Sequence, residues 1–195
     1  NLSPLNDYYN GLVKTQKVAP SSDNINDKLW LFHGTKDTRI NTKVADSLNL
    51  QLQTLFTPSN IKYISDKPFA HLIPTIDYGI NCDSSEAPFI GACNYDAAGE
   101  LLSYLGVINA SRSEASPEIL KTQLSLFSQS DFAGEFANTL AQDGYVFVPP
   151  QCIDKKSCKL HVSFHGCNQN AETVDDQYAM HSGLNEWADS NDIVI

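Results

Sequence analysis

Short apolar runs, each typical of a strand, alternate along this chain with segments of helical periodicity. The run at residues 28–33 is closed by Gly34, residues 41–56 follow with apolar side chains at helical spacing, and residues 61–65 form a second strand run. Residues 77–94 are expected to form a polar loop. Further strands are expected at residues 124–127, 144–149, 159–164 and 193–195, and further helical segments from residue 98 to about residue 106 and over most of residues 171–189. The alternation predicts an α/β fold with a mostly parallel sheet flanked by helices.

The size of the chain allows one hydrophobic core. Its 195 residues are 42% hydrophobic, which suffices for one core but is too little for two separately folded domains. Residues 109–118 resemble a linker, yet each flank is too short to fold alone. We therefore expect residues 1–195 to form a single domain. The chain stops inside the strand run at residues 193–195, which indicates that this domain is only partly present.

Acidic residues outnumber basic ones, with 23 Asp and Glu against 13 Lys and Arg, and the formal net charge is −10. A surface that binds a nucleic-acid duplex has to neutralise phosphates with clustered basic side chains, so this balance argues against nucleic acid as a partner. No apolar run approaches the roughly 18–20 residues that cross a bilayer, so no membrane span is expected. The first residues have neither a basic head nor an apolar centre, so a secretion leader is not expected within this chain.

Five cysteines form two local pairs and leave one over. Cys82 with Cys93, and Cys152 with Cys158, each lie in a loop-like stretch that a short disulfide bridge could staple. Reduced cytosolic proteins seldom pair cysteines in this way, so the pattern favours an oxidising compartment, either extracellular or periplasmic. The odd residue, Cys167, is expected to be free, catalytic or paired with a segment outside this chain.

Two residues at the predicted carboxyl edge of the sheet form a candidate acid–base pair. Asp37 follows the strand at residues 28–33, and His71 lies in a loop after the next strand. A hydrolase sheet delivers an orienting acid and then a general base at this spacing. The carboxylate fixes the imidazole tautomer and stabilises the imidazolium that forms during proton transfer. The alternative is that Asp37 caps the following turn or helix and that His71 is an ordinary loop histidine.

The segment His165-Gly166-Cys167, at the end of the strand predicted at residues 159–164, resembles an oxyanion-hole loop. In esterases a backbone N–H just after such a glycine points at the oxyanion that forms on the substrate. Glycine permits the sharp turn and the close approach of the backbone. On this interpretation Cys167 contributes its amide, and its sulfur is not the nucleophile. The alternative is a plain strand-to-helix turn.

The order of these segments is more informative than any one of them. In an ordinary α/β-hydrolase the oxyanion loop precedes the nucleophilic serine, the acid and the histidine. Here the acid and histidine candidates come first, which predicts a circularly permuted α/β-hydrolase, and permutation is tolerated because fold termini usually lie close together. This order also predicts a nucleophile near the start of the chain. No Gly-x-Ser-x-Gly elbow is present, and the early serines, Ser3, Ser21 and Ser22, lack flanking glycines.

From about residue 28 to the end, an ordered set of motifs resembles the extracellular poly(3-hydroxybutyrate) depolymerases that have a single, circularly permuted α/β-hydrolase domain, and related secreted esterases. The matching segments are GTKDT at residues 34–38, AHLIPT at 70–75, CNYDAAG at 93–99, YVFVP at 145–149, LHVSFHGCNQ at 160–169 and LNEWAD at 184–189. The family's nucleophile lies in a glycine-flanked serine elbow, and no residue here matches it. The resemblance therefore implies part of such a domain, incomplete at both ends.

The resemblance implies a secreted serine esterase in which Asp37 and His71 belong to a Ser-His-Asp triad whose serine lies outside this chain. It implies that the Cys167 amide is an oxyanion donor. It also implies two disulfide bridges, Cys82–Cys93 and Cys152–Cys158. The expected partner is a polyester or a short hydroxyalkanoate ester, and no metal or organic cofactor is required.

Two other functions fit parts of the sequence. Cys152, Cys158, His161, His165 and Cys167 offer five potential zinc ligands within 16 residues. Their spacing lacks a Cys-x2-4-Cys knuckle, and a strand rises too far over four residues for both histidines to reach one ion easily. A catalytically inert hydrolase-like protein that binds polyester or another surface would account directly for the absent serine. Against it, a truncated sheet would expose unpaired edges.

Overall fold

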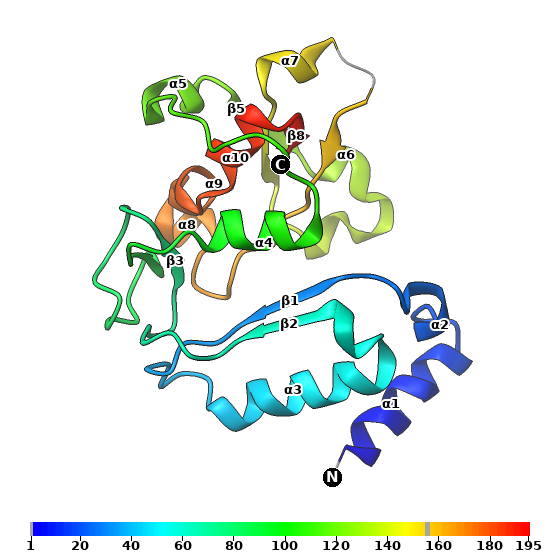
Figure 1. The fold of residues 1–195 in the computed structure, drawn as a ribbon. Helices are drawn as coiled ribbons and strands as arrows, with labels where there is room; N and C mark the ends of the chain where they lie inside the picture. Colours follow the sequence, from blue (N-terminus) through cyan, green and yellow to red (C-terminus); the bar gives the residue numbers. More distant parts are fainter. Residues whose placement is uncertain (1, 155–156) are drawn as a thin grey trace. The chain divides into compact units, whose positions relative to one another are not determined.

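The computed structural model describes residues 2–154 and 157–195, and its backbone divides into two compact units (Figure 1). Unit 1 comprises Asn1–Leu72 and Cys82–Ser85, and unit 2 comprises Ile73–Asn81 and Glu86–Ile195. The acid–base candidates Asp37 and His71 belong to unit 1, whereas Cys167 belongs to unit 2.

Unit 1 is built on one strand–helix–strand arrangement. β1 (Leu29–Phe32) and β2 (Ile61–Ile64) pair in parallel, and the connection between them contains α3 (Thr42–Leu55). Two parallel strands need a crossover of this kind because the end of the first lies far from the start of the second. The remaining elements of unit 1 are α1 (Ser3–Lys14), α2 (Ser21–Asn24) and the 3-10 turn η1 (Pro58–Asn60).

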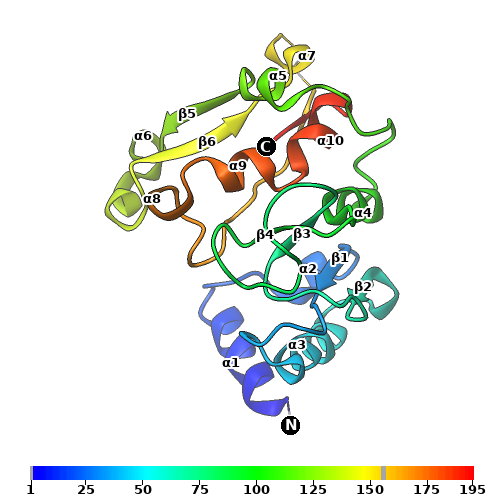
Figure 2. The ribbon, with the colours of Figure 1, turned by 90° about the vertical axis from the view of Figure 1, so that its left-hand side faces the viewer.

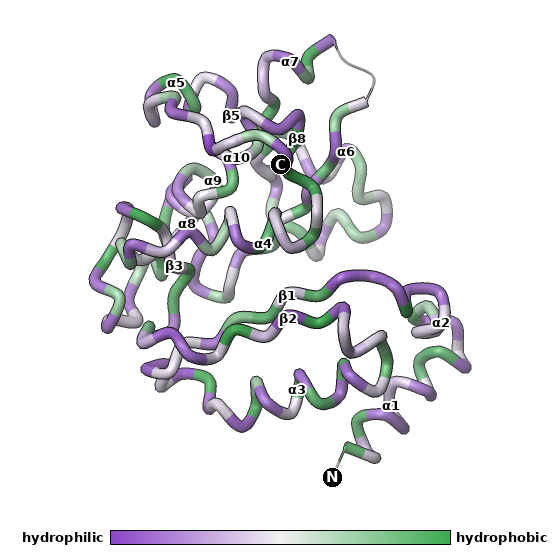
Figure 3. Tube along the Cα trace, in the orientation of Figure 1, coloured by the Kyte–Doolittle hydropathy of each residue, from purple (hydrophilic) through white to green (hydrophobic). Residues whose placement is uncertain are grey.

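α3 begins where the sequence supplies a capping side chain. The Asn41 carboxamide oxygen accepts a hydrogen bond from the Lys43 N–H at 2.9 Å, which satisfies one of the unpaired N–H groups of the first turn. Hydrophobic and hydrophilic residues alternate along the helix (Figure 3), and the Tyr63 hydroxyl of β2 donates to Asp46 of α3 at 3.1 Å. The helix predicted at residues 41–56 is confirmed, and it contacts β2.

The described residues of unit 2 contain the other strands, which form two parallel ladders and one antiparallel ladder. The parallel pairs are β3 (Ile73–Thr75) with β4 (Ile90–Ala92) and β7 (Lys159–Leu160) with β8 (Ile193–Val194). The antiparallel pair, seen side by side in Figure 2, is β5 (Leu124–Ser128) with β6 (Asp143–Phe147). Phe147 and Ile195 exchange both backbone hydrogen bonds, at 2.9 and 3.1 Å, so the end of β6 is joined to the residue that follows β8.

The helices of unit 2 are short. They are α4 (Ala97–Leu105), α5 (Pro117–Lys121), α6 (Ser130–Ala133), the 3-10 segment η2 (Gly134–Thr139), α7 (Pro150–Ile153), α8 (Ala171–Val174), α9 (Gln177–His181) and α10 (Leu184–Ser190). In the described part of the chain, no helix has the length and apolar character needed to cross a bilayer.

The hydrophobic core of unit 2 forms where α5, β6, α10 and β8 meet. Leu120, Phe147, Ala188 and Ile193 are each at most 2% exposed and form one buried cluster. A second buried cluster joins α4 to the start of α10, and the two clusters share partly buried neighbours. The core is therefore continuous from α4 to the strands at the end of the chain.

The predicted α/β class is confirmed, and parallel pairing predominates as expected. Of the four two-stranded ladders formed by residues 2–154 and 157–195, only β5–β6 is antiparallel. The helix predicted to end near Gly106 is confirmed as α4. Gly106 ends it because this residue adopts the left-handed conformation, with φ of +75°, that commonly terminates a helix.

The segment predicted as mostly helical, residues 171–189, is helical in three pieces. Asp175 and Gly183 take positive φ values of +51° and +84°, and they lie between successive helices. A residue with a positive φ cannot continue a right-handed helix, so each of the two changes the direction of the chain.

One strand prediction and one loop prediction are wrong in detail. The strand predicted at residues 159–164 is confined to β7, because its ladder with β8 ends once the His161 N–H has bonded to Val194 O at 2.8 Å. The apolar side chains beyond that point are exposed and have no partner strand among the described residues. The polar loop predicted at residues 77–94 contains β4, which forms because Ile90 is fully buried in parallel pairing with β3.

Replacement of Phe147 by alanine is expected to lower the free energy of unfolding by about 3–5 kcal/mol, because its ring is 1% exposed and a cavity would remain in the core. Phe164 is the matched control, since its ring is 87% exposed. Phe164→Ala is expected to change the unfolding free energy by no more than about 0.5 kcal/mol. Chemical denaturation measures both, and equal losses would contradict this assignment of the core.

Candidate active site

Asp37 divides its two carboxylate oxygens between a turn and a histidine. Oδ1 accepts the backbone N–H groups of Arg39 and Ile40, at 2.8 and 2.9 Å, and so caps the turn that follows β1. Oδ2 lies 2.8 Å from Nδ1 of His71. The carboxylate of Asp37 therefore caps a turn and also bonds an imidazole, while its role as a catalytic acid stays a prediction.

The side chain of His71 is partly exposed, and its second ring nitrogen has no hydrogen-bond partner in the described chain. Its side chain is 44% exposed, whereas that of Asp37 is 6% exposed. Nδ1 faces a carboxylate and therefore carries a proton, which leaves Nε2 of the neutral ring with the free lone pair. Within residues 2–154 and 157–195, no group forms a hydrogen bond with Nε2. An oriented imidazole with an accessible basic nitrogen is the arrangement required of a general base.

The carboxyl group of Asp37 is held in its ionised form. Burial by itself raises the pKa of Asp37, because it penalises the charged state. Hydrogen bonds from the Ile40 N–H, from His71 and from the Arg39 N–H outweigh burial, and the pKa lies below its ordinary value. Asp37 therefore remains an anion at neutral pH and can stabilise a positive charge on His71.

Gly34 allows the Asp37 turn to pass close to the segment that leads to His71. The Lys36 N–H donates to Phe69 O at 3.0 Å, and a Cβ placed on Gly34 would lie only 2.0 Å from the same Phe69 oxygen. No side chain fits at that distance. The pairing of Asp37 with His71 therefore depends on the absence of a side chain at position 34.

Ser85 supports the pair and was not predicted from the sequence. Its hydroxyl accepts the His71 N–H at 3.0 Å, and its carbonyl accepts Nη2 of Arg39 at 2.9 Å. One residue thus links the histidine loop to the turn that Asp37 caps. The sequence carries no signal for this role, because Ser85 is an ordinary loop serine and its partners are 14 and 46 residues away.

His33 was given no role from the sequence, and it lies beside Asp37. It is 5% exposed, its Nε2 is 3.0 Å from Ile40 O, and the same nitrogen is 3.8 Å from Asp37 Oδ2. Because a carbonyl can only accept, Nε2 of His33 carries the proton. The position of His33 at the end of a buried strand, directly before the glycine turn, is a signal that sequence reasoning could have used.

Cys167 lies in the turn between β7 and α8. The Gln169 N–H donates to Gly166 O at 3.0 Å and closes this turn. Cys167 is exposed, and its thiol is the free one among the cysteines of the described chain. The Cys167 N–H finds no acceptor within the described residues, so it is available to an outside group. A covalent partner for its sulfur stays a prediction.

The other four cysteines are oxidised. Cys152 and Cys158 form a disulfide, and Cys82 and Cys93 are disulfide-bonded as well. A disulfide offers no thiolate, and thiolate is the form in which cysteine binds zinc. The zinc site that the sequence suggested is therefore wrong, because two of its five proposed ligands, Cys152 and Cys158, are joined in a disulfide.

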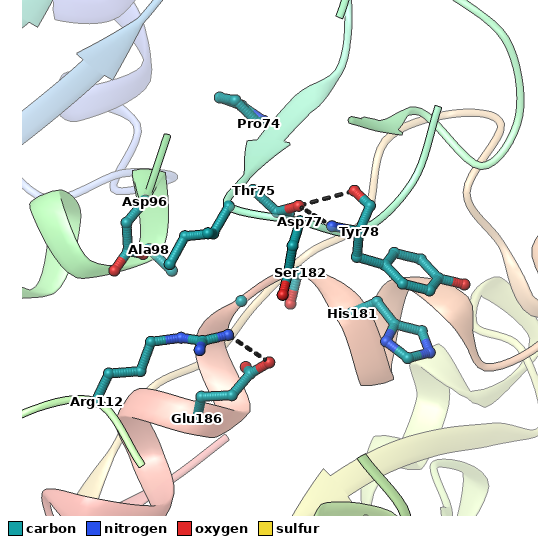
Figure 4. Close-up of a pocket in the computed structure, with 12 residues that line it drawn as sticks. Pro74, Thr75, Asp77, Tyr78, Asp96, Ala98, Arg112, His181, Ser182 and Glu186 are labelled. Carbon is teal, nitrogen blue, oxygen red and sulfur yellow. Dashed lines mark hydrogen bonds and ion pairs between the residues drawn. The ribbon is translucent and has the colours of Figure 1, made fainter. Parts of the chain in front are cut away.

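A small polar pocket lies within unit 2 (Figure 4). Arg112 Nη2 bonds Glu186 Oε1 at 3.0 Å in its wall, and Asp77, Asp96 and Ser182 also line it. Burial raises the pKa of Glu186, and the charges of Asp77 and Asp96 act in the same direction while Arg112 opposes them. The cavity volume is about 20 Å³, which holds about one water molecule. It is too small for an ester chain, and none of the predicted catalytic residues lines it.

Gly34→Ala is expected to destabilise the protein by about 1–3 kcal/mol, because the new methyl group forces the turn away from Phe69 O. Gly11 provides a matched control. It lies in α1 with nothing within 4 Å of an added Cβ, so Gly11→Ala is expected to stabilise by up to about 1 kcal/mol through helix propensity. Thermal or chemical unfolding measures both. A neutral Gly34→Ala would contradict the close approach.

The lowered pKa of Asp37 gives a signed prediction for acid stability. A carboxyl group whose pKa is lower in the folded chain contributes stability above its unfolded pKa of about 3.9, and this stability is lost as pH falls through the folded value. Asp37→Asn removes the titration, so the unfolding free energy of the variant should fall less than that of the wild type between about pH 6 and about pH 3. Equal falls, measured by chemical denaturation, would show that Asp37 is not stabilised as an anion.

In a comparison with known proteins, this chain is similar in sequence to polyhydroxybutyrate depolymerases. No family model matches the chain. The chain is 36% identical over 181 residues to poly(3-hydroxybutyrate) depolymerase of Delftia acidovorans, which corresponds to 91% of this chain and 36% of the relative. It is 32% identical over 173 residues to polyhydroxybutyrate depolymerase of Talaromyces funiculosus, covering 86% of this chain and 49% of the relative.

Solved structures give the same result. The crystal structure of PHB depolymerase from Penicillium funiculosum matches with a TM-score of 0.75 and 31% identity, over 86% of this chain and 52% of that chain. A serine-to-alanine variant of PHB depolymerase, complexed with R3HB trimer, matches over the same shares with a TM-score of 0.76. The chain spans about half the length, or less, of the relatives it matches. In sequence and in its α/β-hydrolase-type fold, this chain is a homologue of the poly(3-hydroxybutyrate) depolymerases.

Proposed function

We propose that this chain is part of a serine-type carboxylic ester hydrolase that cleaves poly(3-hydroxybutyrate) or related hydroxyalkanoate esters. The observation that carries the proposal is the 2.8 Å contact between Asp37 Oδ2 and His71 Nδ1, with Nε2 of His71 left free in the described chain. Similarity to named depolymerases supports the choice of substrate, since one relative was solved with R3HB trimer bound. Asp37, His71 and the Cys167 amide are the residues to which we assign the chemistry.

The first half of the proposed reaction forms an acyl-enzyme. A serine hydroxyl attacks the ester carbonyl carbon, and Nε2 of His71 takes the hydroxyl proton while Asp37 stabilises the resulting imidazolium. The carbonyl π electrons move onto oxygen, and the Cys167 N–H stabilises this oxyanion. When the tetrahedral intermediate collapses, the ester C–O bond breaks and the departing alkoxide takes the proton from His71.

The second half releases the acid. Water attacks the acyl-serine carbonyl carbon, and Nε2 of His71 takes one of the water protons. The bond between the carbonyl carbon and the serine oxygen then breaks, and His71 returns the proton to that oxygen. The free enzyme is restored, and the reaction consumes one water for each ester bond cleaved. No metal or organic cofactor is required for these steps.

The serine of this scheme is proposed to lie outside residues 1–195. No glycine-flanked serine elbow is present in the chain, and the relatives are about two to three times as long as the segments that match. The trimer complex of the solved relative carries a serine-to-alanine substitution, which supports a serine nucleophile in proteins of this kind. Since each match runs over most of the chain, we also propose that residues 1–195 are part of one hydrolase domain.

An extracellular or periplasmic location is part of the proposal. Four of the five cysteines are disulfide-bonded, and disulfides persist in oxidising compartments. A polymer such as poly(3-hydroxybutyrate) outside the cell is a substrate that only an exported enzyme reaches. The acidic net charge of −10 is compatible with an uncharged polyester partner.

The test is an ester assay on the full-length gene product, with p-nitrophenyl butyrate and with the trimer of (R)-3-hydroxybutyrate. The wild type is expected to turn over both and to take up one fluorophosphonate molecule on a serine. Asp37→Asn is expected to lower kcat by about 10⁴-fold through the wrong imidazole tautomer, and His71→Ala by at least as much. His181→Gln is the control histidine, expected to stay within about twofold of the wild type.

Two outcomes would contradict the proposal. A folded wild type with neither turnover nor adduct would favour an inert protein that binds polyester or another surface. Undiminished kcat in His71→Ala would remove the triad while leaving an esterase of another mechanism.

A further inference from the structure

The segment that carries Cys167 has little secondary structure to hold it. After the His161 N–H has bonded to Val194 O, residues 162–166 lie outside helices and strands, and Phe164 is 87% exposed. An oxyanion donor is effective only when its direction is set before the substrate arrives, because reorganisation during the reaction would cancel the benefit. Apart from the backbone hydrogen bond from the Gln169 N–H to Gly166 O, the restraints on this segment come from side chains.

The first restraint is the side-chain amide of Gln169. Its Oε1 accepts the Gly166 N–H at 3.0 Å, and its Nε2 donates to Pro88 O at 3.0 Å and to Phe89 O at 3.1 Å. Gln169 is only 7% exposed, so these contacts are sheltered from water. A primary amide is the group that supplies two donors and one acceptor in this arrangement. It fixes the peptide next to Cys167 to a second loop.

The second restraint is the hydroxyl of Tyr178, in α9. It lies 3.0 Å from Phe164 O and 2.7 Å from Ser163 Oγ. A carbonyl only accepts, so Tyr178 donates to Phe164 O and Ser163 donates to Tyr178. Burial raises the pKa of Tyr178, with Ser163 opposing it, so the phenol keeps the proton that this contact needs. The Tyr178 and His165 rings also form a T-shaped pair, with centroids 6.2 Å apart.

Both restraints lead to ordered parts of unit 2. Phe89 O, which accepts from Gln169, also accepts the Ile73 N–H at 2.8 Å, and these two residues lie at the start of the β3–β4 ladder. Tyr178 lies in α9, a helix that is anchored by the buried Met180, which is 4% exposed. Gly166 is therefore linked through Gln169 to the start of the β3–β4 ladder, and Phe164 is linked through Tyr178 to α9.

We propose that Gln169 and Tyr178 are positioning residues that set the direction of the Cys167 backbone N–H, so that it is a preorganised oxyanion donor. This inference rests on the proposed ester hydrolysis. Neither side chain takes part in bond making. Their loss lets the donor turn away from the oxyanion, which weakens binding of the transition state while the substrate is still bound normally.

The test compares Gln169→Glu and Tyr178→Phe with the wild type in the full-length gene product. Gln169→Glu keeps the shape and the acceptor but removes both donors. Tyr178→Phe removes one hydroxyl. Gln53→Glu and Tyr8→Phe, both at exposed positions of unit 1, are the matched controls. The measurements are kcat and KM for p-nitrophenyl butyrate, the inhibition constant of n-butylboronic acid, and the melting temperature.

Each positioning variant is expected to lower kcat by about 10- to 100-fold, less than the about 100- to 1000-fold that follows removal of a donor outright. KM should stay within about twofold, and affinity for the boronic acid, which mimics the tetrahedral intermediate, should fall in parallel with kcat. The two controls should match the wild type. A side chain with a structural role alone would lower the melting temperature and leave the kcat and boronate affinity of the folded enzyme unchanged.

The outcomes separate this inference from the proposed function. Wild-type turnover with unchanged kcat and boronate affinity in both folded variants would overturn the positioning role alone. A folded wild type without turnover would overturn the proposed function, and the positioning role with it. If Gln169→Glu fails to fold, Tyr178→Phe decides the question, because it deletes a single oxygen atom.

Discussion

A buried carboxylate has to find partners for both of its oxygens, and this requirement explains much of unit 1. Burial by itself raises the pKa of Asp37, and three hydrogen bonds outweigh it and lower that pKa below its ordinary value. Two of them come from the backbone of the turn after β1, and the third comes from His71. The turn can reach the histidine loop only because Gly34 has no side chain. The same contacts that keep the anion charged thus orient the imidazole.

Loops at both candidate regions are held by side chains that bond to backbone groups. Ser85 accepts the N–H of His71 in unit 1, and Gln169 accepts the N–H of Gly166 in unit 2. A hydrogen bond of this kind sets the direction of a peptide without requiring a strand or a helix. It also satisfies a backbone group that would otherwise remain unpaired. Chemistry placed in loops can be preorganised in this way, because the supporting residues belong to the rest of the fold.

The oxidised cysteines narrow the range of functions. The Cys152–Cys158 disulfide removes the thiolates that a zinc site would need, and it is typical of an oxidising compartment. The pocket in unit 2 has room for about one water molecule and is lined by the half-buried Arg112–Glu186 ion pair, so it does not compete as a substrate site. Circular permutation stays a prediction from the order of Asp37, His71 and Cys167, and the role of a serine stays a proposal.

The sequence by itself determined the α/β class, the approximate bounds of α3 and α4 and the expectation that Asp37 and His71 lie together, because these depend on local periodicity, capping residues and strand ends. Only the tertiary structure decided which oxygen of Asp37 meets which nitrogen of His71. It also decided the roles of Ser85, His33 and Gln169, whose partners lie far away in the chain or depend on how its turns close. Strand length was misjudged at β7 because a strand needs a partner, and pairing is set by distant residues that no local pattern encodes.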